Sequence, residues 1–379
     1  MQSLDFSLRW CLVALLSMSG LVAAERYDLS VVLINDTEPG FNELSAERNM
    51  GFRLGVEWAT RAQGSAPTLQ VSVREQQLPR SVWAAETLPS LEILPAEIVW
   101  IAPIQARKTH RLIQYAQAYE RVLLVPASPA NALPIADSPW AFRTFYRWHD
   151  VESALLSWTA GEARVWVSAL SESVDLPANV ERVQVSPRSS GAAVIDRLVT
   201  QFQSNQAGRI VNSWLPMLTW LDELMTQTAL TPTQLTTWLP DLDGLAVLSQ
   251  FSGIYGLTYY YYDLPDNDIN DWLVRTTLER TGRLPTQTMV AGMASALALV
   301  AAWQRLDDPA EVRAPELRLA FHDLHWLAPQ GEMRILASGE TQLPFFRTRL
   351  RQQPQLEWAR PVLLTGGNIV THPQSEPPN

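Results

Sequence analysis

The sequence predicts an α/β protein with two lobes, each a mainly parallel sheet flanked by helices. Short apolar runs alternate with amphipathic stretches between residues 29 and 125, and the same alternation restarts between residues 163 and 238. Such alternation favours parallel strands covered by helices on both faces. Two long helical stretches, 268–281 and 288–306, then follow with no strand between them. These late helices indicate that the chain returns to the first array and completes it.

The first array begins with the run 29–34, which has the length and apolar character of one buried strand. The next segment carries Met50, Leu54 and Trp58 at four-residue spacing, the period of a helix with one buried face. Later segments are assigned in the same way. Further strands are expected at 69–73, 97–102 and 122–125, and helices at 43–62, 81–88 and 106–118.

The second array consists of shorter and less regular segments. Residues 241–250 fit a helix or a strand equally well. The run Tyr259–Tyr262 has high β propensity and is interpreted as part of a crossover strand at 256–262 that is packed on both faces. Helices are expected at 150–159, 191–203 and around 218–225, and strands at 163–168, 180–185, 209–214 and 235–238.

Composition and charge exclude several classes of protein. The chain has 379 residues, 47% hydrophobic and 18% charged, which excludes a disordered or fibrous chain. The net charge of -10 and the absence of a basic run argue against nucleic acid as a partner. The single cysteine, Cys11, lies in a segment that we expect to be removed. The mature chain would then have no disulfide, no thiolate nucleophile and no cysteine metal site.

Residues 1–24 have the pattern of a secretory signal peptide. Arg9 supplies a positive charge, residues 10–16 are apolar, and Val22-Ala23-Ala24 provides small residues at a cleavage site. A membrane anchor is the competing interpretation. A spanning helix needs about 20 predominantly apolar residues, and this run is shorter and interrupted. The segment therefore predicts export to the periplasm.

No enzyme motif is found. The segment Asn35–Gly40 lacks the glycines of a dinucleotide-binding fingerprint, and neither a P-loop nor a Gly-x-Ser-x-Gly elbow occurs. Lys108 is the only lysine, which limits Schiff-base chemistry to one residue. His322 and His325 could hold a metal, but a turn or helix end is the simpler interpretation of that spacing. We therefore expect no catalytic activity, no metal and no cofactor, and a secreted hydrolase is the least favoured alternative.

Short motifs along the chain occur in a distinctive order. Arg48-Asn-Met-Gly-Phe-Arg-Leu-Gly-Val-Glu-Trp-Ala59 follows the first strand and its loop, and Phe142-Arg-Thr144 lies where the first array ends. Arg283-Leu-Pro285 precedes a helix of small residues, and Ala328-Pro-Gln-Gly331 precedes Leu356-Glu-Trp358. In this order, the segments resemble the type I periplasmic solute-binding proteins of ABC importers, in particular the branched-chain amino acid, urea and short-chain amide group. The resemblance covers most of residues 27–360.

The resemblance implies that a small solute binds between the lobes, at loops that follow the strands. Thr37 and Glu38 are the candidates from the first loop of the first lobe. The loop after the third strand has Ile104 and Gln105 where the family usually carries a serine, and Gln105 is the candidate there. The loop after the fourth strand carries Ser128, which fits the family's Ser or Thr at this place.

The second lobe departs further from the family. The segment 169–175 contains Ser171 but lacks the aromatic residue that the family usually places there. Trp214 and Trp238 end two predicted strands, where aromatic faces could line a cleft. The clamp for the ammonium and carboxylate groups of an amino acid is not visible. A neutral or apolar solute is therefore at least as well favoured as an amino acid.

These inferences together predict the organisation and function of the chain. The expected function is capture of a small solute by hinge closure between the lobes, followed by docking of a monomer on an ABC permease in the inner membrane. The solute would be an amino acid, urea or amide, or another small neutral or apolar molecule. The alternative is a sensor or accessory protein of the same fold that binds a membrane or envelope partner. Residues 25–144 and 264–328 are assigned to lobe 1, 145–263 and 329–372 to lobe 2, and 373–379 to a disordered tail.

Overall fold

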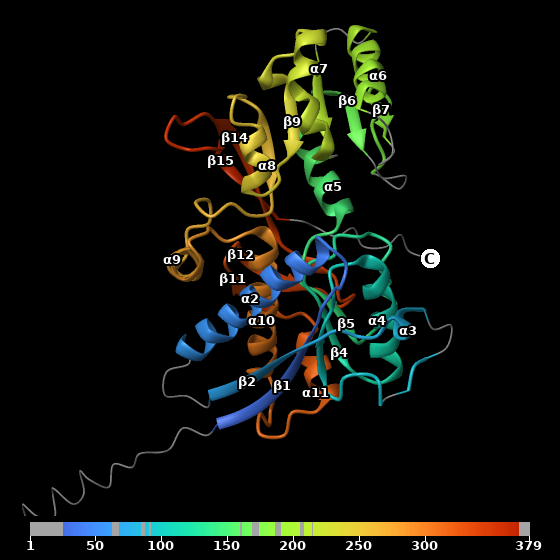
Figure 1. The fold of residues 1–379 in the computed structure, drawn as a ribbon, viewed down its shortest axis with the longest axis vertical. Helices are drawn as coiled ribbons and strands as arrows, with labels where there is room; N and C mark the ends of the chain where they lie inside the picture. The colour runs from blue at the N-terminus through green and yellow to red at the C-terminus, as the bar shows by residue number, and fades with distance from the viewer. Residues whose placement is uncertain are drawn as a thin grey trace, which may run out of the picture.

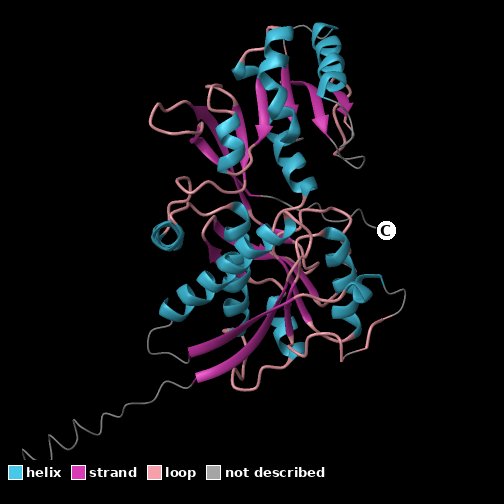
Figure 2. Ribbon diagram, in the orientation of Figure 1, coloured by secondary structure: helices cyan, strands magenta, loops and turns pink. Residues whose placement is uncertain are grey.

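Five parallel strands form the first sheet, in the order β2-β1-β3-β4-β5 (Figure 1). The short central strands β3 and β4 are buried at every position, as expected for strands with helices on both faces (Figure 2). The strands are β1 (Arg26–Ile34), β2 (Thr68–Gln76), β3 (Val99–Ile101), β4 (Val122–Val125) and β5 (Ala141–Arg143), and the helices among them are α2 (Phe41–Ala62), α3 (Arg80–Ala84) and α4 (Ala106–Ala118).

The second sheet has seven strands, in the order β15-β14-β10-β9-β8-β6-β7. Its strands β6 to β10 are parallel to their neighbours, whereas β14 and β15 add an antiparallel edge. The strands are β6 (Ala163–Ser168), β7 (Glu181–Gln184), β8 (Arg209–Asn212), β9 (Leu235–Trp238), β10 (Tyr255–Thr258), β14 (Pro344–Arg351) and β15 (Arg360–Val370). The helices are α5 (Trp148–Thr159), α6 (Gly191–Ser204), α7 (Leu221–Thr228) and α8 (Leu242–Val247), with short 3₁₀ turns at Leu215–Trp220 and Pro232–Gln234.

This computed structural model describes residues 26–62, 68–84, 88–90, 92–159, 161–168, 174–185, 191–204, 208–213 and 215–370. The predicted signal peptide (1–24) and the predicted tail (373–379) lie outside these residues. So do Ser171 and Trp214, two of the candidate ligand contacts.

The structure confirms the predicted α/β fold of two parallel sheets flanked by helices, and it corrects details. The ambiguous segment 241–250 forms helix α8, which begins after Asp241. The predicted strand 256–262 ends early, because β10 stops at Thr258 and Tyr259–Tyr261 continue as a buried connection. The predicted strand 209–214 stops at Asn212.

Helices α9 (Asp268–Thr281), α10 (Gln287–Trp303) and α11 (Ala314–Phe321) follow the second array. Helix α10 packs along α2, beside the first sheet (Figure 1). Their backbones touch, since a Cβ on Gly292 would lie 2.1 Å from the carbonyl oxygen of Arg48 and one on Gly51 would lie 1.8 Å from that of Met289. The late helices therefore return to the first array, as the sequence predicted.

A small antiparallel sheet follows α11 and consists of β11 (His325–Ala328), β12 (Gly331–Ile335) and β13 (Thr341–Gln342). It attaches to the first sheet, because the backbone N–H of Arg143 on β5 donates to the carbonyl oxygen of Gly339 at 2.9 Å. The chain enters the second sheet again only at β14. The predicted lobe boundary between residues 328 and 329 falls between β11 and β12, and the division of the chain into lobes remains a prediction.

Aromatic side chains fill the junction where the chain passes between the two main sheets. We call Phe145, Tyr146, Trp238, Tyr259 and Phe345 the junction aromatic cluster. The ring centroid of Tyr146 lies 5.0 Å from that of Trp238, and the centroid of Trp238 lies 5.6 Å from that of Phe345. The five side chains are at most 5% exposed except Tyr146 at 6%. The junction is thus an apolar core that is continuous with the first sheet.

We expect Gly292→Ala to lower the free energy of unfolding by about 3 kcal/mol, because the added methyl group would meet backbone atoms of α2 that cannot move independently. Urea unfolding followed by circular dichroism measures the change. The control is Ala62→Ser at the exposed end of α2, for which the change should stay within about 0.5 kcal/mol. A Gly292→Ala protein as stable as the wild type would contradict the close helix contact.

Burial raises the pKa of Tyr146, Tyr259 and Tyr260 well above the usual value of 10.0. In the unfolded chain these phenols ionise near their ordinary pKa, so above about pH 10 the unfolded state loses protons that the folded state retains. Stability should therefore fall as the pH rises through this range. In a titration monitored by phenolate absorbance, at least three of the nine tyrosines should ionise only together with loss of near-ultraviolet circular dichroism. Ionisation of all nine in the folded protein would contradict the buried placement.

Candidate functional site

The carboxyl ends of β1, β3 and β4 meet at one edge of the first sheet, where α/β proteins usually bind ligands. Asp36 joins two of the loops at this edge. Its Oδ2 accepts hydrogen bonds from the backbone N–H groups of Ile104 (2.8 Å) and Gln105 (3.3 Å). Its Oδ1 lies 3.3 Å from Nζ of Lys108, an ion pair without hydrogen-bond geometry. The carboxylate is fully buried, so it fixes the loop after β3 against the loop after β1.

Arg48 holds the same edge from α2. Its guanidinium is fully buried and donates to the carbonyl oxygens of Ile34 (3.2 Å) and Ala102, at the ends of β1 and β3. It also donates to Oδ1 of Asn35 at 2.7 Å. Burial lowers its pKa to about 10, which leaves the group charged at neutral pH. A positive charge therefore lies beneath the loops.

Arg143 holds the third loop, which follows β4. Its guanidinium is fully buried and donates to the carbonyl oxygens of Ser128 (2.5 Å) and Ala130 (3.1 Å). Its Nε lies 2.8 Å from Oε2 of Glu340, in the turn between β12 and β13. This ion pair joins residues 197 positions apart in the sequence. It ties the small antiparallel sheet to the edge of the first sheet.

The four predicted contacts of the first lobe lie along this edge. Thr37 is exposed and Glu38 is half-exposed, and Glu38 pairs with Lys108. The Lys108 ammonium lowers the pKa of Glu38 below its usual value, mainly through a hydrogen bond. Gln105 is half-buried at the start of α4. Ser128 is 1% exposed, and its Oγ has no hydrogen-bond partner among the described residues.

In the second lobe, a buried carboxylate lies at the carboxyl ends of the strands. Glu152 on α5 is fully buried, and its Oε1 accepts hydrogen bonds from the hydroxyl groups of Ser168 (2.7 Å) and Ser213 (2.9 Å). Its Oε2 has no hydrogen-bond partner within the described chain. Trp238, the predicted contact on β9, is 1% exposed and belongs to the junction aromatic cluster. Whether it contacts a solute remains a prediction.

Sequence reasoning missed the charged residues that build the site. Asp36 follows directly on the first predicted strand, and Lys108 is the only lysine, so both carried a weak signal. Arg143 lay inside a quoted motif but was given no role. Glu152 had no signal, because its partners lie 16 and 61 residues further along the chain.

The described residues contain neither a metal-ligand cluster nor a membrane-spanning helix. No group of three or more His, Cys, Asp or Glu side chains in this part of the chain could hold a metal ion. None of the helices found there combines the length and apolar character that a membrane span needs. His322 and His325 flank a turn at Asp323, which has a positive φ of 50° and pairs with Arg334.

We expect Glu340→Ala to lower the free energy of unfolding by about 3 kcal/mol, because it would leave the guanidinium of Arg143 buried without its counter-charge. Denaturant unfolding measures the change. The matched control is Glu311→Ala, which removes an exposed ion pair with Arg313 and should cost less than about 1 kcal/mol. Equal effects of the two substitutions would show that the Arg143–Glu340 pair does not hold this edge.

Comparison with known proteins places the fold. No protein-family model and no curated protein sequence matches the chain. Among solved structures, an ABC-type branched-chain amino acid transporter protein from Rhodopseudomonas palustris is similar, with a TM-score of 0.70 and 20% identity over 89% of this chain and 96% of that chain. A solute-binding protein of an ABC transporter from R. palustris, in complex with 4-hydroxybenzoate, has a TM-score of 0.69 and 13% identity over 91% and 98% of the two chains. A leucine-binding protein from Thermotoga maritima has a TM-score of 0.62 and 12% identity over 91% and 99%. The chain therefore has the two-lobed fold of the solute-binding proteins of ABC transporters.

Proposed function

We propose that the protein is the solute-binding component of an ABC importer. The observation that carries this proposal is a similarity in fold that covers 89% of this chain and 96% of the solved relative. A predicted signal peptide at 1–24 adds the periplasmic location that such a component needs. The partners would be a small solute and a permease in the inner membrane, and the protein would act as a monomer without catalytic activity.

The first-lobe half of the solute site would consist of Thr37, Glu38, Gln105 and Ser128. Rigid loops suit this role, since Asp36, Arg48 and Arg143 already satisfy the backbone groups that shape them. The hydroxyl of Ser128 has no partner among the described residues. It would gain one when a solute binds, which makes burial of that polar group less costly.

The second-lobe half would consist of Ser171, Trp214 and Trp238. Trp238 would reach a solute only if the junction aromatic cluster rearranged when the lobes close, because its ring is packed against Tyr146 and Phe345. The buried carboxylate of Glu152 would orient the hydroxyl groups of Ser168 and Ser213 toward itself.

The solved relatives suggest which solutes to test. One of them is a leucine-binding protein, and two others are solute-binding proteins in complex with 4-hydroxybenzoate and with benzoate. The panel for the mature protein is therefore aliphatic amino acids, urea and short-chain amides, and benzoate with its hydroxylated derivatives.

Thermal shift and calorimetry on this panel test the proposal. One class should raise the melting temperature, and Ser128→Ala should weaken its binding about tenfold through loss of one hydrogen bond. The control is Ser72→Ala on the exposed edge strand β2, which should bind as the wild type does. The proposal fails if no member of the panel binds at millimolar concentration, or if the bound solute is indifferent to Ser128→Ala.

A further inference from the structure

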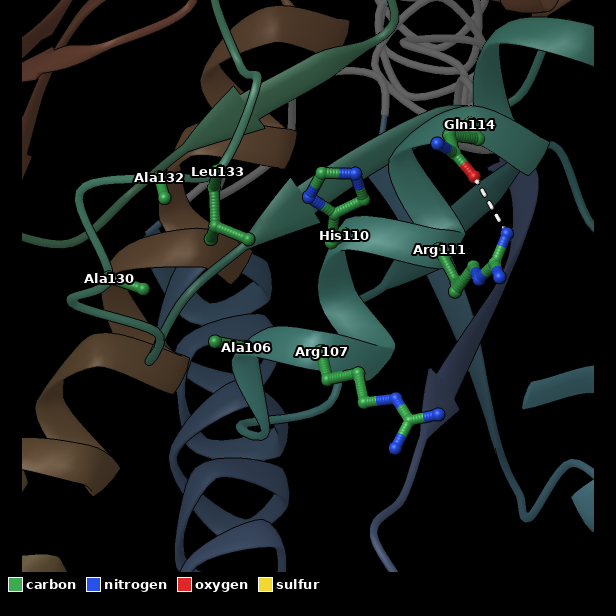
Figure 3. Close-up of a pocket in the computed structure, with 8 residues that line it drawn as sticks. All are labelled: Ala106, Arg107, His110, Arg111, Gln114, Ala130, Ala132 and Leu133. Atoms are coloured by element: carbon green, nitrogen blue, oxygen red, sulfur yellow. Dashed lines mark hydrogen bonds between the residues drawn. The ribbon is translucent and has the colours of Figure 1, made fainter. Parts of the chain in front are cut away.

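Two adjoining hollows lie on either side of helix α4. One, of about 540 Å³, lies between α4 and the loop after β4 (Figure 3). The other, of about 220 Å³, lies between α4, α3 and the loop after β1. Arg107 and Arg111 line both hollows, and Arg80 lines the second. We call the two hollows together the arginine pocket.

The arginine pocket concentrates positive charge, and its three arginines have no ion-pair partner among the described residues. Within the described residues, none of Arg80, Arg107 and Arg111 has a carboxylate within 4.0 Å. Arg111 donates to the amide oxygen of Gln114 at 3.4 Å. The neighbouring Lys108 differs, because it pairs with both Asp36 and Glu38. Three guanidinium groups thus share one surface in a chain whose net charge is -10.

Two of these like charges are neighbours on one helix. Arg107 and Arg111 are four residues apart on α4 and extend to the same side of the helix (Figure 3), so their like charges repel. Arg107 lies in the first turn of the helix, where the helix dipole disfavours cations, and that turn contains no acidic residue. Exposed acidic partners stabilise several other arginines of the chain, among them Arg53 and Arg313.

We propose that the arginine pocket binds a small carboxylate. Guanidinium groups recognise a carboxylate through paired hydrogen bonds. The half-buried ring of Trp83 and the side chains of Ala130 and Leu133 supply apolar walls for the rest of the molecule. The larger hollow falls within the range of about 300–1,000 Å³ that is typical of small-molecule sites.

The inference rests on the proposed function and narrows its substrate class. Glu38 and Gln105, two of the predicted solute contacts, also line the smaller hollow. An anionic group held by Arg107 and Arg111 would therefore lie beside the first-lobe half of the solute site. This favours an anionic solute over the neutral or apolar solute that the sequence left open.

Calorimetry with benzoate, succinate and inorganic phosphate as probes tests the inference, with benzamide as the neutral counterpart of benzoate. At least one carboxylate should bind, and if it is benzoate, benzamide should bind at least tenfold more weakly. The double variant Arg107→Gln/Arg111→Gln should lose at least tenfold in affinity for that carboxylate. Arg53→Gln, which removes an exposed arginine of α2, is the matched control and should bind as the wild type does. Circular dichroism checks that each variant is folded.

Several outcomes would overturn the assignment. These are binding of no carboxylate probe, equal carboxylate binding by the double variant and the wild type, and phosphate binding that depends on the arginines while no carboxylate binds. The Ser128→Ala variant separates this inference from the proposed function. If a neutral solute depends on Ser128 and is unaffected by the double variant, the importer role stands and the carboxylate site fails. If a carboxylate depends on the arginines but not on Ser128, the arginine pocket stands and the interlobe site for that solute fails.

Discussion

The buried carboxylate of Asp36 is the interaction on which the geometry of the candidate site depends. A charged group without water is costly unless it is paired and hydrogen-bonded. Asp36 meets that requirement with two backbone N–H groups and the ammonium of Lys108. Because these partners belong to the loop after β3 and to α4, the loop after β1 can adopt only the position that brings them together.

Arg48 and Arg143 are buried charges of the opposite sign, and they too are stabilised by hydrogen bonds. Each buried guanidinium has several donors. Arg48 donates to carbonyl oxygens at the ends of β1 and β3, and Arg143 donates to carbonyl oxygens of the loop after β4. The loops that would contact a solute are therefore held from beneath, and the side chains on their outer surface remain available. A binding site gains affinity from such preorganisation, since less loop entropy is lost when the ligand binds.

The junction between the two main sheets has a different physical character. It is filled by aromatic rings rather than by charges, and four separate segments of the chain contribute to it. Pairs of aromatic rings stabilise one another by about 0.5–1.5 kcal/mol beyond burial of their area. A hinge movement that separated these rings would lose such contacts. A hinge movement that bent only the connections around the cluster would preserve them.

The sequence by itself determined the fold class and most of the elements. Helix α4 and strands β4, β6 and β9 have the bounds expected from apolar periodicity, because that pattern is local and follows from burial of one face or of a whole strand. Only the tertiary structure decided which charged residues build the site. Asp36 meets Ile104 across 68 residues, and Arg143 meets Glu340 across 197. Such pairings depend on where the sheets and loops bring distant segments together, and no local pattern encodes that position.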